Sequence, residues 1–121
     1  MQSQEIPSQQ WGAFLDNITR RHEGENVSIE VQSQEIAAQS KAHDVRLVGI
    51  TFDPRERIGQ EIDVMVSNDA NAHLMHAIMH PSHVRIARTD DGLDSALQVE
   101  SKGGPTTLVK FNPPAQENRP Q

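Results

Sequence analysis

A chain of 121 residues has the usual length of one domain, and its formal net charge of −6 comes from 17 acidic and 11 basic residues. This excess of acidic charge opposes binding to a phosphate backbone, because such binding depends on neutralising phosphates with lysine and arginine. The absence of cysteine excludes disulfides, thiolate nucleophiles and cysteine-based zinc motifs. The N-terminal residues lack the features of a signal peptide, and no stretch approaches the roughly 20 apolar residues that span a bilayer, so we expect a cytoplasmic protein without a membrane segment.

The first regular element that the sequence predicts is a helix over residues 8–23. Its apolar residues fall at i, i+3, i+4 and i+7, basic residues occupy the last turn, and Gly24 follows as a terminator. We interpret the tryptophan of this stripe as the residue that anchors the helix on a sheet, with an interface anchor as the alternative. The stripe consists of Trp11, Phe14, Leu15 and Ile18.

After Gly24 the apolar residues alternate as they do in β-strands. The connecting turns are too short for the crossovers that parallel strands need, so we expect a mostly antiparallel sheet. In one strand the buried side changes near Gly49, which predicts a bend or a bulge there. Besides the histidine-rich segment at residues 73–83, the predicted strands are NVSIEV, VRLVGITFDP, EIDVMV, HVRIAR, ALQVES and TTLVKF.

These elements predict one α+β domain over residues 1–112, in which the N-terminal helix packs on a curved, mostly antiparallel sheet of six or seven strands or on a partly open small barrel. Aromatic residues make up only 3% of the chain, so the core is expected to be mainly aliphatic. Residues 113–121 are rich in proline and polar side chains, which predicts a flexible tail.

The segment HLMHAIMHPSH holds four of the six histidines and is the strongest candidate for chemistry. On a helix these residues would gather around one metal ion, but Pro81 disfavours a helix and favours extended backbone at His80. On a strand, His76 and His80 lie roughly 13 Å apart, which is too far to share an ion, although His76 could still meet a histidine beyond Pro81. We therefore predict a structural or pH-sensitive role for this segment, and the alternative is a metal site formed by His73, His76, His80 or His83.

Trp11 and the motifs LVGITFDP, HLMHAIMHPSHVRI and ALQVESKGGPTTLVKF together resemble the pattern of a family of small bacterial proteins of unknown function. The resemblance covers nearly the whole chain up to Asn112, and it implies a shared fold without supplying catalytic residues. The succession of a helix and bent strands is also similar to the small barrels of the Sm-like and SH3-like type. The glycine and asparagine pattern of the Sm loops is absent, so no RNA-binding residue is carried over.

The leading functional hypothesis is a non-enzymatic binding or assembly module that forms a homodimer, needs no cofactor and can take a protein partner. It rests on apolar residues at positions that a strand would turn outward. The candidate interface residues are Trp11, Met65, Met75 and Met79. The runner-up hypothesis is a histidine-based metal-binding protein or metalloenzyme. A third hypothesis, a nucleic-acid module, would use an arginine cluster made of Arg46, Arg55, Arg57, Arg85 and Arg88.

Overall fold

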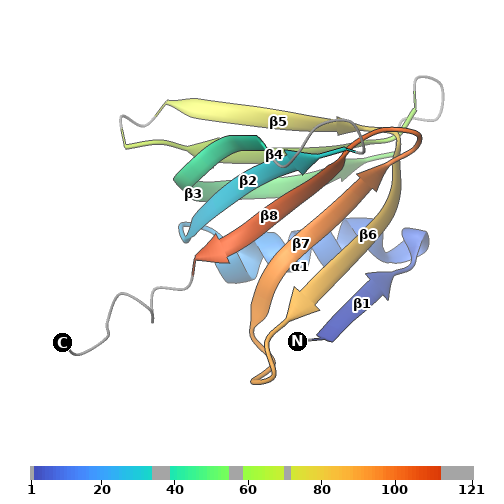
Figure 1. Ribbon diagram of the computed structural model, residues 1–121, viewed down its shortest axis with the longest axis horizontal. Helices are drawn as coiled ribbons and strands as arrows, with labels where there is room; N and C mark the ends of the chain where they lie inside the picture. Colours follow the sequence, from blue (N-terminus) through green and yellow to red (C-terminus); the bar gives the residue numbers. More distant parts are fainter. Residues whose placement is uncertain (1, 34–38, 55–58, 70–71, 113–121) are drawn as a thin grey trace.

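The structure is a computed structural model that describes residues 2–33, 39–54, 59–69 and 72–112, so the tail predicted at 113–121 lies outside the described residues. The described chain forms one α-helix, a short 3-10 helix at Ser8–Gln10 and a single antiparallel sheet in the order β1-β6-β7-β8-β2-β3-β4-β5 (Figure 1). The elements are β1 (Gln2–Ile6), α1 (Trp11–His22), β2 (Asn26–Gln32), β3 (Gln39–Asp53), β4 (Glu61–Ser67), β5 (His73–Met79), β6 (Pro81–Arg88), β7 (Asp94–Ser101) and β8 (Thr106–Asn112).

The predicted α+β class with six or seven strands is wrong, because the described chain is mostly β and has eight strands in one sheet. The strand that the sequence did not predict is β1. Its sequence, QSQEI, is polar and only Ile6 is buried, so it carries no apolar alternation. Long-range pairing with β6 makes it a strand, from Gln2 opposite Arg88 to Ile6 opposite Val84. An exposed edge strand is held by backbone hydrogen bonds to one neighbouring strand. Such a strand needs no alternation of apolar residues, so its sequence does not reveal it.

A sharp corner at His80 separates β5 from β6. β5 pairs with β4 at one edge of the sheet, whereas β6 pairs with β1 and β7 near the other edge. The φ of His80 is 52°, in the left-handed region, so the expectation of extended backbone there is wrong. At His80 the chain changes direction and passes from a strand that pairs with β4 to a strand that pairs with β1 and β7. Hydrogen bonds hold the corner on both sides, from the His80 N–H to the Gln60 carbonyl (2.9 Å) and from the Lys102 N–H to the His80 carbonyl (2.8 Å).

The sheet is strongly curved, and α1 lies inside the curve (Figure 1). His76 on β5 comes within 3.4 Å of Thr107 on β8, although three strands lie between β5 and β8 in the sheet order. The inward side chains of the strands and the buried side chains of α1 form one core. Its largest fully buried members are aliphatic: Leu15, Ile18, Val27, Ile29, Leu47, Ile50, Ile62, Val64, Val66, Val84, Ile86 and Leu97.

α1 runs beside the second half of β3, beyond the point where β2 begins. There the Thr19 hydroxyl accepts a hydrogen bond from the Ile50 N–H (2.9 Å) and donates one to the Ile50 carbonyl (3.1 Å). These two bonds satisfy backbone groups that a neighbouring strand would otherwise satisfy. The pairing register of β3 with β4 shifts between Leu47 and Gly49, which confirms the irregularity predicted near this glycine.

Trp11 ties the start of α1 to two strands. Its indole Nε1–H donates to the Ile6 carbonyl at the end of β1 (2.9 Å), and its ring meets the ring of Phe52 on β3 edge to face at 5.4 Å. The indole is buried. The part of the chain that the structure describes contains no helix with the length and apolar character needed to cross a membrane.

Candidate functional site

The four histidines of residues 73–83 lie in different surroundings. His73 is exposed on β5, and His76 is half-buried on the inward side of β5 with its Nε2 near the Thr107 hydroxyl. The His80 ring packs against Gly59, where an added Cβ would lie 2.3 Å from the His80 Cε1. His83 on β6 contacts the Glu5 carboxylate through Nδ1 at 2.7 Å. Among residues 2–33, 39–54, 59–69 and 72–112, no group of three or more histidine and acidic side chains is placed to hold a metal ion.

Two hollows of about 260 and 330 Å³ are lined in part by β5, and a third of about 270 Å³ adjoins them; we call the three together the β5 hollow. The first hollow shares His76 with the second and Lys41 with the third, and the second shares Val31 and Pro105 with the third. The hollow lies between β5 and the ends of β2, β3 and β8 that α1 does not reach. Its walls are mainly apolar and include Ile29, Val66, Leu74, Ile78 and Met79.

His76 lines two of the three hollows, which also contain the titratable side chains of Lys41 and Lys102. Burial lowers the pKa of His76, and the positive charge of Lys41 lowers it further. A neutral imidazole can donate one hydrogen bond and accept another without bringing charge into an apolar wall. The arrangement suits recognition of a polar group by hydrogen bonding.

The His76 ring is expected to titrate below the ordinary histidine value of about 6.5 in an NMR titration of its Cε1–H signal. Because folding lowers this pKa, the folded chain binds fewer protons here than the unfolded chain, so this group reduces stability as the pH falls through about 6.5. Lys41→Met should raise the pKa, since it removes a positive charge. Lys110→Met is the matched control, because Lys110 pairs with Glu30. Titration of His76 at or above the ordinary value would contradict this prediction.

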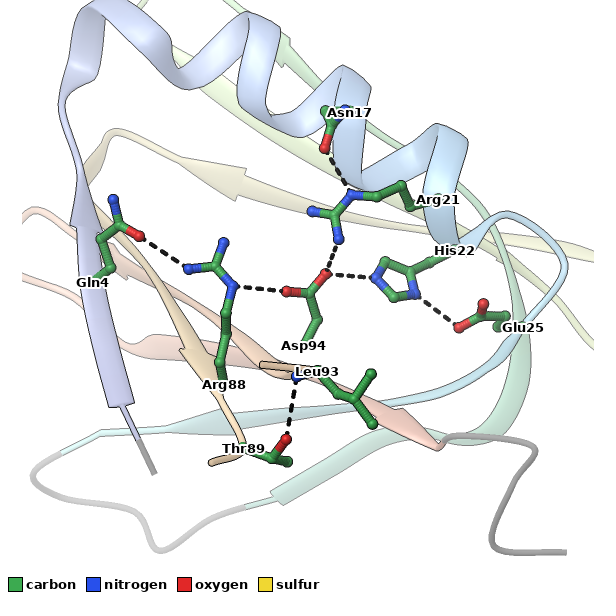
Figure 2. A network of polar contacts seen from close by, with 9 residues as sticks. All are labelled: Gln4, Asn17, Arg21, His22, Glu25, Arg88, Thr89, Leu93 and Asp94. Atoms are coloured by element: carbon green, nitrogen blue, oxygen red, sulfur yellow. Dashed lines mark hydrogen bonds and ion pairs between the residues drawn. The ribbon is translucent and has the colours of Figure 1, made fainter. Parts of the chain in front are cut away.

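A second cluster gathers around Asp94 at the start of β7 (Figure 2). The Asp94 side chain is 1% exposed, and its Oδ2 accepts hydrogen bonds from Arg21 Nη1 (2.5 Å) and His22 Nε2 (2.7 Å). Its Oδ1 accepts a hydrogen bond from Arg88 Nε at 3.1 Å. Asp94 therefore joins the last turn of α1 to the end of β6 and the start of β7.

The His22 ring lies between two carboxylates. Its Nδ1 is 2.8 Å from Glu25 Oε1, its Nε2 contacts Asp94, and the ring stacks on Phe111 with centroids 4.4 Å apart. Each ring nitrogen of His22 therefore faces a carboxylate oxygen, and the ring links Glu25 to Asp94.

The charge of Asp94 is balanced by its neighbours. Burial alone would raise the pKa of Asp94, but the hydrogen bond from His22 and the positive charge of Arg21 outweigh it, and the pKa lies below its usual range. A carboxylate held ionised by three donors cannot readily accept a proton from a substrate. We therefore assign the cluster a structural role, which locks the end of α1 to the β6–β7 turn.

The sequence predicts only one half of this cluster, the basic residues in the last turn of the helix, where cations suit the helix dipole. His22 and Asp94 are 72 positions apart. No local spacing signal joins residues at that separation, and only the pairing of strands brings them together.

The other candidate residues occupy separate surfaces. Met65 lies opposite Met75 on the outer side of β4 and β5, and Met75 and Met79 are exposed. Of the proposed arginine cluster, Arg55 and Arg57 lie outside the described residues. The described members each face a carboxylate: Arg46 faces Asp69 at 3.7 Å, Arg85 contacts Glu5 and Glu100, and Arg88 contacts Asp94.

These features define a small protein built on one curved antiparallel sheet, with a helix inside the curve and an apolar edge strand beside a hollow. The chain belongs to a family of unknown function (DUF5335), whose model matches residues 2–120. It is also similar to an "Uncharacterized protein" of Aquifex aeolicus (strain VF5), with 26% identity over 113 residues that cover 93% of this chain and 95% of the relative. No solved structure matches the chain. The predicted membership of a small bacterial family of unknown function is confirmed, and the likeness to Sm-like and SH3-like barrels stays a prediction.

Proposed function

We propose that the protein is a non-enzymatic assembly module that forms a homodimer through the edge strand β5. The observation that carries this proposal is the composition of that edge. β5 exposes Leu74, Met75 and Met79 and contains no lysine, arginine, aspartate or glutamate. The unpaired backbone groups of an edge strand can pair with another chain, and proteins that stay monomeric usually protect such an edge with charge or proline.

The strand at the opposite edge of the sheet, β1, is polar and carries a charge, unlike β5. Its sequence is QSQEI, its first four residues are exposed and polar, and Glu5 carries a charge that contacts His83 and Arg85 on β6. Of the two edges, only β5 offers an apolar surface for association. This contrast supports β5 as the interface.

β5 is also complementary to itself. Two copies paired antiparallel about a two-fold axis at His76 would place Leu74 opposite Ile78 and Met75 opposite Ala77. Close to the axis apolar residues would then meet apolar residues on both faces, Met79 would lie opposite His73, and no like charges would oppose each other at neutral pH. Such a pairing is isologous and closes as a dimer rather than continuing as a fibre.

A dimer is expected in native mass spectrometry and sedimentation of the untagged protein at micromolar concentration. Met75→Lys should raise the dissociation constant of the dimer roughly 10- to 100-fold, because two ammonium groups would have to be buried in the interface. Leu93→Lys is the matched control, since Leu93 is exposed in the turn before β7 and away from β5. A monomeric wild-type protein, or a Met75→Lys protein as dimeric as the control, would refute the proposed interface.

The histidine-based metal site, a cytoplasmic location and a further protein partner stay predictions from the sequence. The native mass spectrum also tests the metal site, because stoichiometric zinc, nickel or iron would add to the mass of each subunit. His76→Ala should remove such an ion if His76 is a ligand.

A further inference from the structure

We propose that the β5 hollow binds a small amphipathic carboxylate, with its apolar chain against Leu74 and Ile78 and its carboxylate paired with Lys41. This site goes beyond the assembly role. It lies within one protomer but borders the proposed interface, because Leu74 and Ile78 belong to both.

The inward face of β5 is covered by other side chains at its Ile78 end and is exposed at its Leu74 end. Leu74, His76 and Ile78 lie opposite Val66, Val64 and Ile62 of β4, whose side chains belong to the core. Ile78, close to the His80 corner, is 3% exposed, but Leu74 is 49% exposed. A leucine on the core-facing side that stays half exposed shows that the described residues do not fill the interior at this end.

The unfilled space has the size and the walls of a small-molecule site. Its adjoining parts measure about 260 and 330 Å³ and meet at His76. Natural ligand sites begin at roughly 300 Å³ and are mostly apolar, with a few polar groups that orient the ligand. Here the polar groups are His76 and Thr107, in the middle of the apolar wall.

The charge around the hollow differs from that of the whole protein. The chain has 17 acidic and 11 basic residues, yet the described residues that line these hollows include Lys41 and Lys102 and no aspartate or glutamate. Within the described residues Lys41 contacts no carboxylate, whereas Lys110 is paired with Glu30 at 2.8 Å. An ammonium group that no described carboxylate contacts, beside an apolar wall, complements an anion with an apolar chain.

His76 supports the same ligand class. Its pKa is lowered by burial and by Lys41, so the ring is neutral at pH 7 and can donate one hydrogen bond to a carboxylate oxygen. A cationic ligand would meet Lys41 without a compensating acid among the described lining residues. A purely apolar ligand would gain nothing from the positive charge of Lys41.

The test uses decanoate below its micelle-forming concentration, with decanol and decylammonium as matched probes, in calorimetry and amide NMR of the full chain. Decanoate should bind and shift the signals of Leu74, His76 and Thr107. Decanol should bind more weakly, and decylammonium should not bind. Sedimentation of the same samples reports self-association separately, so failure of the dimer and failure of this site give different results.

Lys41→Met should weaken decanoate binding about three- to tenfold and leave decanol binding unchanged, because the exposed ammonium contributes a partly screened ion pair. Lys110→Met should change neither. Equal affinity for decanoate and decanol, no effect of Lys41→Met, or signal shifts confined to residues outside the hollow would each overturn the proposal. Lys41 is exposed, so its replacement does not endanger folding.

Discussion

Replacing Asp94 by asparagine is expected to lower the free energy of unfolding by about 2–4 kcal/mol. The buried carboxylate accepts hydrogen bonds from Arg21, His22 and Arg88. Asparagine has nearly the same size, but its amide nitrogen cannot accept a hydrogen bond, and its neutral side chain removes the negative charge that Arg21 and Arg88 contact. The Arg21 side chain is 43% exposed, so water retains part of its solvation and the loss stays below that of a fully buried ion pair.

Urea unfolding followed by the fluorescence of Trp11, the only tryptophan, measures this change. Asp91→Asn is the matched control, because Asp91 lies in the same β6–β7 connection and is exposed. A loss no larger than that of the control would contradict the structural role of the Asp94 cluster.

The difference in the free energy of unfolding between the wild-type and Asp94→Asn proteins should depend on pH, because the pKa of Asp94 is lowered in the folded protein. A carboxyl whose pKa is lower in the folded than in the unfolded chain stabilises the fold above the unfolded value, about 3.9, and this contribution is lost as the pH falls through the folded pKa. The stability difference between the wild-type and Asp94→Asn proteins should therefore shrink below about pH 4. A difference that persisted unchanged to lower pH would show that the charge of Asp94 is not the cause.

Leu15→Ala is expected to lower the free energy of unfolding by about 2–5 kcal/mol, with a fall in the melting temperature of about 10 °C or more. Leu15 is 0% exposed and packs between α1 and the sheet in the single core, so truncation leaves a cavity that the neighbouring strands cannot easily fill.

Thermal unfolding with calorimetric detection measures this loss. Leu93→Ala makes the same chemical change at a side chain that is 57% exposed, and it should alter stability by less than about 0.5 kcal/mol. Similar losses for the two variants would mean that α1 does not share the core of the sheet.

Much of the secondary structure followed from local patterns in the sequence. The i, i+3, i+4, i+7 stripe predicted a helix that the structure places at Trp11–His22, after the 3-10 turn Ser8–Gln10. The alternation in EIDVMV predicted the buried Ile62, Val64 and Val66 of β4. Helix and strand periods are local properties, because side chains a few positions apart already determine which face of an element can be buried.

The strand count could not be predicted in the same way. β1 lacks apolar alternation and is a strand because it pairs with β6. The corner at His80 forms because β5 pairs with β4, whereas β6 pairs with β1 and β7. The partner of a strand is selected by competition among all possible pairings, so residues far apart in the chain decide it. Pro81 favours extended backbone at His80 through contacts between adjacent residues alone. The corner between β5 and β6 requires a left-handed conformation at His80, and this requirement outweighs the local preference.

The sequence by itself determined the aliphatic core, the helix and most of the strands. Only the tertiary structure decided the order of the strands, the cluster around Asp94 and the hollow beside His76. Local periodicity specifies which face of each element is apolar, but the curvature of the whole sheet decides which apolar faces are covered. That curvature buries Ile78 and leaves Leu74 open on the same face of β5.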